Sequence, residues 1–228
     1  MAHTLVAPKH KEKYEEIYRR GYDKKYPSLD LVRLERWYFK GRTGRVLDYG
    51  FGVGENLTHL LECGYRVDGL ETATEAKRIV ERKLAERPEL RDRATLQIID
   101  TDAVRLPYAD ETFDYVICLS VLSLLESRAR VERLLQEFRR VMKPGAKMLV
   151  DINGPSSDFT KHAVPLGEDV YQYSGNAGEE EPRLYYCPAT AERFRELLAP
   201  FTIDDMGSVS FSYLGNEDFE FIACARKP

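Results

Sequence analysis

The amino-acid sequence predicts an α/β fold in which helices cover both faces of one largely parallel sheet. Strand-like and helix-like segments alternate from residue 45 onward. The strand-like runs are short and apolar without polar alternation, which is typical of strands buried on both faces. A glycine-rich turn joins the first run to a helical pattern, as at the start of a strand–turn–helix unit.

The composition favours one soluble globular domain. The chain has 228 residues, of which 43% are hydrophobic and 32% are charged. No apolar stretch approaches the roughly 18 residues that cross a membrane, and the N-terminus lacks the apolar core of a signal peptide. We therefore expect a cytoplasmic location and no membrane partner. The net charge of −4 argues against nucleic acid as a partner.

The first 44 residues predict a helical cap. Residues 9–22 have a helical pattern, and a second helix is expected after Pro27. In that second segment Leu31, Leu34 and Tyr38 form an apolar stripe at helical spacing. We expect residues 1–44 to form this cap and residues 45–228 to form the main domain.

The main domain is expected to contain seven strands. Strands are predicted near 45–49, 66–70, 95–99, 115–119, 146–152, 203–211 and 219–225. Helices are predicted near 54–63, 74–87 and 128–142, with a further helix starting after Pro188. An insertion near 153–187, rich in glycine, proline and tyrosine, interrupts the alternation. Insertions of this length are often lids or binding loops.

The turn after the first strand indicates a cofactor site. Residues 48–54 place glycines at 50, 52 and 54, so the spacing is G-x-G-x-G rather than the dinucleotide pattern G-x-G-x-x-G. Glycine lets a ligand approach the backbone, and the following helix offers free N–H groups. Asp48 would repel a pyrophosphate but suits a cationic amino group. This favours a nucleoside cofactor with an amino-acid tail, although a purely structural turn is the alternative.

Acids also follow the next two strands. Glu71 lies about 20 residues after the glycine turn, where an acid is expected to bond ribose hydroxyls. Asp102 and Ala103 follow the third strand-like run. The alternative for both acids is a surface position at a strand end.

Taken in order, these motifs resemble those of the class I S-adenosylmethionine-dependent methyltransferases. The resemblance covers roughly residues 46–150, with a looser match from residue 188 onward. It rests on five segments in register: 48–54, 69–71, 102–108, 113–116 and 143–145. It implies a Rossmann-like, seven-stranded, mostly parallel sheet whose last strand is antiparallel and lies between the fifth and sixth. It also implies S-adenosylmethionine as cofactor.

The resemblance further implies roles for individual residues. The turn, with Asp48, Gly50, Gly52 and Gly54, would lie against the methionine and ribose portions, and Glu71 would bind the ribose hydroxyls. The remaining cofactor-binding candidates are Asp102 and Ala103 at the adenine, Thr72 and Leu119 packing around it, and Tyr14 and Tyr18 on a helix that closes over the cofactor in relatives. For the tyrosines, simple packing on the core is an equal alternative.

Two departures from the family pattern leave the catalytic residues unknown. Phe51 stands where a small residue or cysteine is common, so it either wedges against the first helices or crowds the cofactor. Residues 120–125 lack the histidine often found after the fourth strand, which removes an obvious base. The four cysteines and four histidines show no metal-ligand spacing, so no metal is expected.

We therefore expect an S-adenosylmethionine-dependent methyltransferase that acts on a small-molecule acceptor, at an oxygen atom. One alternative is a non-catalytic S-adenosylmethionine-binding partner or regulator. A second is an NAD-dependent oxidoreductase, against which the glycine spacing counts. The oligomeric state stays open between monomer and homodimer.

Overall fold

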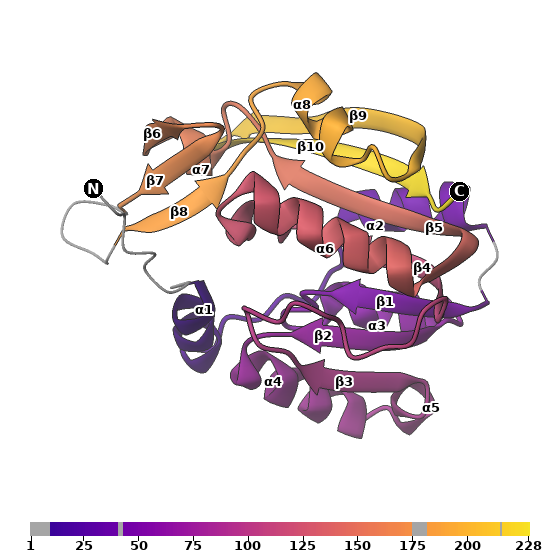
Figure 1. The fold of residues 1–228 in the computed structure, drawn as a ribbon. Helices are drawn as coiled ribbons and strands as arrows, with labels where there is room; N and C mark the ends of the chain where they lie inside the picture. The colour runs from indigo at the N-terminus through magenta and orange to yellow at the C-terminus, as the bar shows by residue number, and fades with distance from the viewer. Residues whose placement is uncertain (1–9, 41–42, 175–181, 215) are drawn as a thin grey trace.

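A computed structural model describes residues 10–40, 43–174, 182–214 and 216–228. Its main feature is a seven-stranded sheet with the strand order β3-β2-β1-β4-β5-β10-β9 (Figure 1). β1 to β5 run parallel to one another, whereas β10 is antiparallel to both β5 and β9. This confirms the predicted fold, including the last strand between the fifth and sixth. The strands are β1 (Arg45–Tyr49), β2 (Arg66–Glu71), β3 (Ala94–Ile98), β4 (Phe113–Cys118), β5 (Met142–Asn153), β9 (Thr202–Tyr213) and β10 (Asn216–Arg226).

Helices cover both faces of this sheet, because the central strands are apolar on both sides. In β1, Val46 belongs to one buried cluster and Leu47 to the other. The cluster of Val46 contains residues of α2 (Leu29–Leu34), η1 (Glu35–Phe39), α3 (Glu55–Glu62), α4 (Thr74–Ala85) and α5 (Pro88–Arg91). The cluster of Leu47 contains residues of η2 (Leu122–Leu125), α6 (Arg128–Val141) and α8 (Ala191–Leu197).

The predicted insertion forms a small second sheet. Its strands β6 (Ala163–Gly167), β7 (Val170–Tyr173) and β8 (Arg183–Tyr186) pair antiparallel, preceded by the short helix α7 (Asp158–Lys161). Tyr185 of β8 stacks on Phe159 of α7 with ring centroids 4.1 Å apart. Figure 1 places this sheet at the same end of the molecule as α1. Residues 175–181 of the insertion lie outside the described part.

The N-terminal segment begins with α1 (His10–Arg19), which is shorter than the predicted helix 9–22. It ends before Gly21, whose φ of +91° no longer belongs to a right-handed helix. The second helix is anchored by its predicted stripe: Leu31 is fully buried, and the Tyr38 hydroxyl donates to Asp204 Oδ2 over 2.8 Å. Residues 1–9 and 41–42 of the predicted cap lie outside the described residues. Across the described helices, none is both long and apolar enough to span a bilayer.

Candidate functional site

A cavity of about 460 Å³ opens at the carboxyl ends of β1, β2 and β4. In Figure 1 the arrows of β1 and β2 point toward α1, which lies across this end of the sheet. The carboxyl edge of a parallel sheet is where open α/β folds bind ligands. The lining combines the glycine turn, the ends of β2 and β4, and α1. Among the predicted site residues, those lining it are Gly50, Gly52, Glu71, Thr72, Leu119, Tyr14 and Tyr18.

The glycine turn has a backbone that other residues would strain. Gly50, at φ +79°, could not carry a Cβ, because that atom would lie 2.4 Å from Val121 Cγ2. Gly54, at φ +83°, is the N-cap of α3, and a Cβ there would lie 2.6 Å from Val80 Cγ2. Gly54 does not line the cavity in the free protein, and the lack of a side chain there makes room for Val80 of α4.

Phe51 packs inward from the turn. Its side chain is buried in the cluster that contains Tyr18 and Leu57. A Cβ built on Gly69 of β2 would lie 2.6 Å from Phe51 Cδ1, so the glycine on the neighbouring strand makes room for the ring. Phe51 thus wedges between the sheet and the neighbouring helices, and because it also lines the cavity, both alternatives for its role have support.

Glu71 is held in place by backbone donors. Its Oε2 accepts a hydrogen bond from the Gly52 N–H over 3.0 Å, and its Oε1 accepts from the N–H groups of Thr72 and Ala73. The carboxylate therefore joins the end of β2 to the glycine turn after β1. It lines the cavity and is almost fully buried.

Two acids lie near the turn: Asp48, which is buried, and Glu55, which is partly buried and whose Oε1 lies 3.8 Å from Lys24 Nζ. Asp48 Oδ2 and Glu55 Oε2 are both buried without a hydrogen-bond partner among the described residues. Burial raises the pKa of Asp48 well above its usual range, and the nearby carboxylates of Glu55 and Glu71 raise it further. Glu55 lines the cavity, whereas Asp48 lies behind the lining.

These orphaned oxygens provide a test of cofactor fit. A buried carboxylate oxygen without a hydrogen-bond partner is costly, and a cation that reaches it stabilises it. The α-ammonium group of an amino-acid tail supplies such a cation, so the residues fit the expected cofactor. Sequence reasoning selected Asp48 but missed Glu55, the first residue of α3. Its position directly after the glycine turn was the available signal.

Tyrosines of α1 form one wall of the cavity. Tyr14 and Tyr18 both line it, and their ring centroids lie 5.9 Å apart. Burial raises the pKa of both hydroxyls, so both stay protonated at neutral pH. A Cβ on Gly52 would lie 3.3 Å from the Tyr18 hydroxyl oxygen. The helix thus approaches the backbone of the glycine turn closely.

Asp102 and Ala103 lie outside the cavity lining. The Asp102 side chain is 70% exposed and Oδ1 lies 3.3 Å from Nη2 of Arg130. The Ala103 N–H donates to the Asp100 carbonyl over 3.1 Å. Their neighbours Thr101 and Arg130 line the cavity instead. Their roles at an adenine ring therefore stay predictions, which require Asp102 to leave Arg130.

His10 also lines the cavity, and sequence reasoning did not select it. Its Nε2 lies 2.8 Å from the Leu184 carbonyl oxygen, and its ring meets Tyr185 edge to face. Burial lowers the pKa of His10 to about 4, so the imidazole is neutral at pH 7. No spacing in the sequence connects residue 10 to residue 184, so only tertiary structure could find this residue.

One group of potential metal ligands exists in the described part of the chain, away from the cavity lining. The ligand atoms of Glu35, His59 and Cys63 lie within 4.8 Å of one another. Hydrogen bonds link the same atoms: the Tyr65 hydroxyl donates to Glu35 Oε1 over 2.8 Å, and Cys63 Sγ lies 3.6 Å from His59 Nε2. Hydrogen bonds within the protein thus explain why these three side chains lie close together.

Comparison with known proteins agrees with the geometry. A family model described as a methyltransferase domain matches residues 47–150, which include the end of β1, all of β2 to β4 and most of β5. A protein of Encephalitozoon cuniculi that is named as a methyltransferase is 27% identical over 184 residues, covering 75% of this chain and 80% of that protein. The ubiquinone/menaquinone biosynthesis C-methyltransferase of Paracoccus denitrificans is 32% identical over 135 residues, covering 58% of this chain and 49% of that enzyme.

A solved structure has the same fold over the whole chain. It is the 1,6-didemethyltoxoflavin-N1-methyltransferase of Burkholderia thailandensis, with bound 1,6-didemethyltoxoflavin and S-adenosylhomocysteine. The TM-score is 0.69 at 20% identity, and the match covers 100% of this chain and 93% of that one. The relatives thus include enzymes named for methyl transfer to carbon and to nitrogen.

Proposed function

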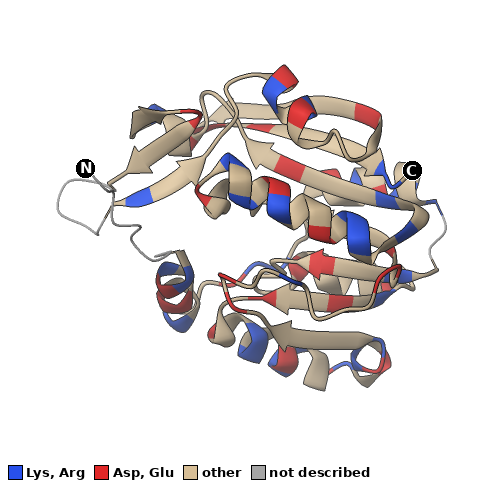
Figure 2. Cartoon of the chain, viewed as in Figure 1, with Lys and Arg blue, Asp and Glu red and all other residues tan. Residues whose placement is uncertain are grey.

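Because the chain belongs to the class I S-adenosylmethionine-dependent methyltransferases, with S-adenosylmethionine as cofactor, we propose that it methylates a small organic acceptor at an oxygen atom. The observation that supports a small acceptor is the cavity itself. At about 460 Å³ it lies within the range of small-molecule sites, and α1 covers it. The distribution of charge also favours a small acceptor over a nucleic acid, since Figure 2 shows basic and acidic segments interspersed on the helices.

The cofactor supplies a methyl group on a sulfonium, which an acceptor atom attacks in line. The residues of this chain bind and orient the two molecules. We assign Asp48 and Glu55 to the α-ammonium group, Glu71 to the ribose hydroxyls, and the backbone at Gly50 and Gly52 to close contact with the tail. The further cofactor contacts proposed are Gly54, Thr72, Asp102, Ala103, Leu119, Tyr14 and Tyr18.

On the acceptor side we assign His10. The imidazole is neutral at pH 7, and its Nε2 is engaged by the Leu184 carbonyl. This leaves Nδ1, which has no hydrogen-bond partner in the described structure, as the proton-accepting atom. A hydroxyl acceptor has a proton to lose on methylation, and a positioned imidazole is the commonest group to take it. His10 replaces the histidine that residues 120–125 lack.

The test uses S-adenosylmethionine carrying a carbon-13 methyl group. The protein is incubated with this cofactor and a fraction of small metabolites, and labelled products are identified by mass and by NMR. We expect a methyl signal bonded to oxygen. Label on nitrogen or carbon would overturn the assignment to oxygen and leave the family unchanged. Cofactor binding without any labelled product would favour the non-catalytic regulator instead.

A further inference from the structure

The exposed face of the second N-terminal helix has an unusual composition. Within α2, η1 and the residue that follows, from Leu29 to Lys40, six side chains are exposed. Three are apolar or aromatic and three are basic, and none is acidic: Leu29, Val32, Trp37, Arg33, Arg36 and Lys40. We call these six residues the α2 face. Leu29 is 78% exposed and Trp37 is 68% exposed, so both side chains lie largely in water although their helical segment packs on the core.

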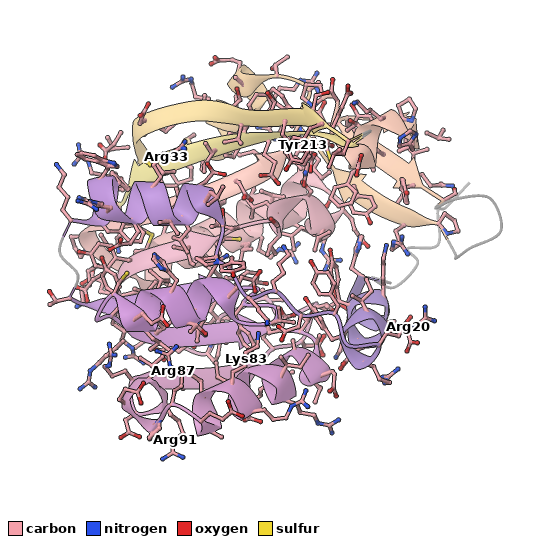
Figure 3. The ribbon with its side chains drawn as sticks, turned by 180° about the vertical axis from the view of Figure 1, so that it is seen from behind. Arg20, Arg33, Lys83, Arg87, Arg91 and Tyr213 are labelled. Atoms are coloured by element: carbon pink, nitrogen blue, oxygen red, sulfur yellow. The ribbon has the colours of Figure 1, made fainter. Side chains whose placement is uncertain are left out.

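The cations of this face have no acidic partner. Among the described residues, no ion pair includes Arg33, Arg36 or Lys40. The segment contains two acids: Glu35 points inward and accepts the Tyr65 hydroxyl, and Asp30, in the first turn of α2, is partly buried. Figure 3 looks at the side of the molecule where α2 lies and labels Arg33 on it. Positive charge and apolar surface are therefore offered together, and a partner must be anionic and apolar at once.

We propose that the α2 face is a contact surface for an anionic lipid bilayer. In a protein interface, apolar residues gather in a core and charges lie at the rim. Here the apolar and basic side chains are intermixed along one continuous helical segment, α2 followed by η1, with no separate apolar centre. A bilayer interface suits that mixture, since arginine and lysine reach lipid phosphates while their stems and the neighbouring Leu, Val and Trp enter the acyl boundary. The sequence alone predicted no membrane partner, and this surface departs from that expectation.

The α2 face begins at the mouth of the cavity. Pro27 and Ser28, which precede Leu29, line the cavity, and so does Tyr26, whose side chain is 82% exposed. Lys25, beside Tyr26, is also exposed. A bilayer in contact with the α2 face would thus lie next to the cavity mouth. The surface is independent of the atom that is methylated, so its test does not depend on turnover.

Trp37 gives a direct measurement, because it is the only tryptophan in the chain. The full chain is mixed with vesicles of phosphatidylcholine and phosphatidylglycerol, or of phosphatidylcholine alone. With the anionic vesicles we expect a blue shift of tryptophan emission, protection from acrylamide, and co-sedimentation. Unchanged emission and protein left in the supernatant would overturn the proposal. An emission change that follows protein concentration without lipid would assign the face to a second copy and also overturn it.

Charge reversal on the face has a matched control elsewhere. Arg33→Glu with Arg36→Glu should weaken binding to the anionic vesicles about tenfold or more. The control is Arg82→Glu with Arg139→Glu, on the exposed sides of α4 and α6, which changes net charge equally. Equal loss in both double variants would reduce the effect to overall charge and contradict a specific surface. Calorimetry with S-adenosylhomocysteine confirms that each variant is folded.

Discussion

Glu15 of α1 caps α4 at Thr74: its Oε1 accepts a hydrogen bond from the Thr74 backbone N–H over 2.7 Å. Its Oε2 accepts from the next N–H, that of Glu75, over 2.9 Å. The N-cap residue of α4, Ala73, has no side chain able to do this. A carboxylate from another helix thus satisfies two free donors and faces the positive end of the helix dipole. This contact anchors α1 over the cavity.

Replacing Glu15 with alanine should loosen that anchor. We expect a loss of about 1 kcal/mol in unfolding free energy, the scale of a lost helix cap. S-Adenosylhomocysteine should also bind more weakly, because Tyr14 and Tyr18, which line the cavity, belong to the same helix. Denaturant unfolding and calorimetry measure the two effects. Glu12→Ala is the control, as Glu12 is exposed on α1; equal effects from both changes would disprove the anchoring role.

Replacing Glu71 should weaken cofactor binding. Glu71→Ala removes a carboxylate held by three backbone N–H groups at the cavity wall. We expect S-adenosylhomocysteine to bind about 1–3 kcal/mol more weakly, the scale of a hydrogen bond to a charged group. Glu71→Gln, which keeps an acceptor for the N–H groups, separates ligand contact from local folding. Unchanged affinity of both variants in calorimetry would remove Glu71 from the site.

Asp48 should make stability fall as pH rises. Burial raises its pKa above the unfolded value of about 3.9, so the folded protein binds more protons than the unfolded chain. Its contribution is complete below the unfolded pKa and is lost as pH rises toward the folded pKa. Above about pH 4 the wild type should therefore lose unfolding free energy relative to Asp48→Asn, whose side chain does not titrate. A flat difference from acid to neutral pH would contradict this.

Ligand binding offers a second measurement on the same acid. A cationic ammonium group stabilises the ionised form of Asp48, whose pKa is raised in the free protein, so binding of S-adenosylhomocysteine should release protons. Calorimetry in buffers of different ionisation enthalpy detects that release. 5′-Methylthioadenosine, which lacks the amino-acid tail, should release none. Equal proton release by both ligands would place the ammonium group elsewhere.

His10 has the opposite pH dependence. Its pKa is lowered from 6.5 to about 4, mainly by burial, so the unfolded chain binds more protons between these values. The difference in unfolding free energy between wild type and His10→Gln should increase as pH rises from 4 to 6.5. The same variant should slow methyl transfer while S-adenosylhomocysteine binds as before. A normal rate would exclude His10 as the proton acceptor.

Asp102 is tested through the base of the ligand. If its carboxylate accepts the adenine amino group, Asp102→Ala should reduce the preference for S-adenosylhomocysteine over its inosine analogue. The carboxylate must first leave Arg130, so Arg130→Gln should not abolish that preference. Competition binding measures both variants. The same preference in Asp102→Ala and wild type would return Asp102 to the surface-acid alternative.

Local sequence patterns predicted the strands of the sheet and the part of the site that the glycine turn and the end of β2 provide. A glycine turn, apolar strands and acids at strand ends depend on the conformation of neighbouring residues, so Gly50, Gly52 and Glu71 could be placed at the carboxyl edge from sequence. The antiparallel last strand between the fifth and sixth followed from the family resemblance, and the structure has it there. Phe51 was recognised as unusual, but its wedged position needed Gly69 on the next strand.

Contacts between distant segments decided the rest. The pairing of Glu15 with Thr74 and of His10 with Leu184 joins residues far apart in the chain, and no periodicity encodes such contacts. The rotation of Asp102 toward Arg130 is a side-chain choice that α6 imposes. The exposure of Trp37 likewise depends on which side of η1 packs on the sheet. Sequence determined which residues each element contains, and tertiary packing decided which of them face the cavity, the core or the surrounding water, because burial is a property of the assembled layers.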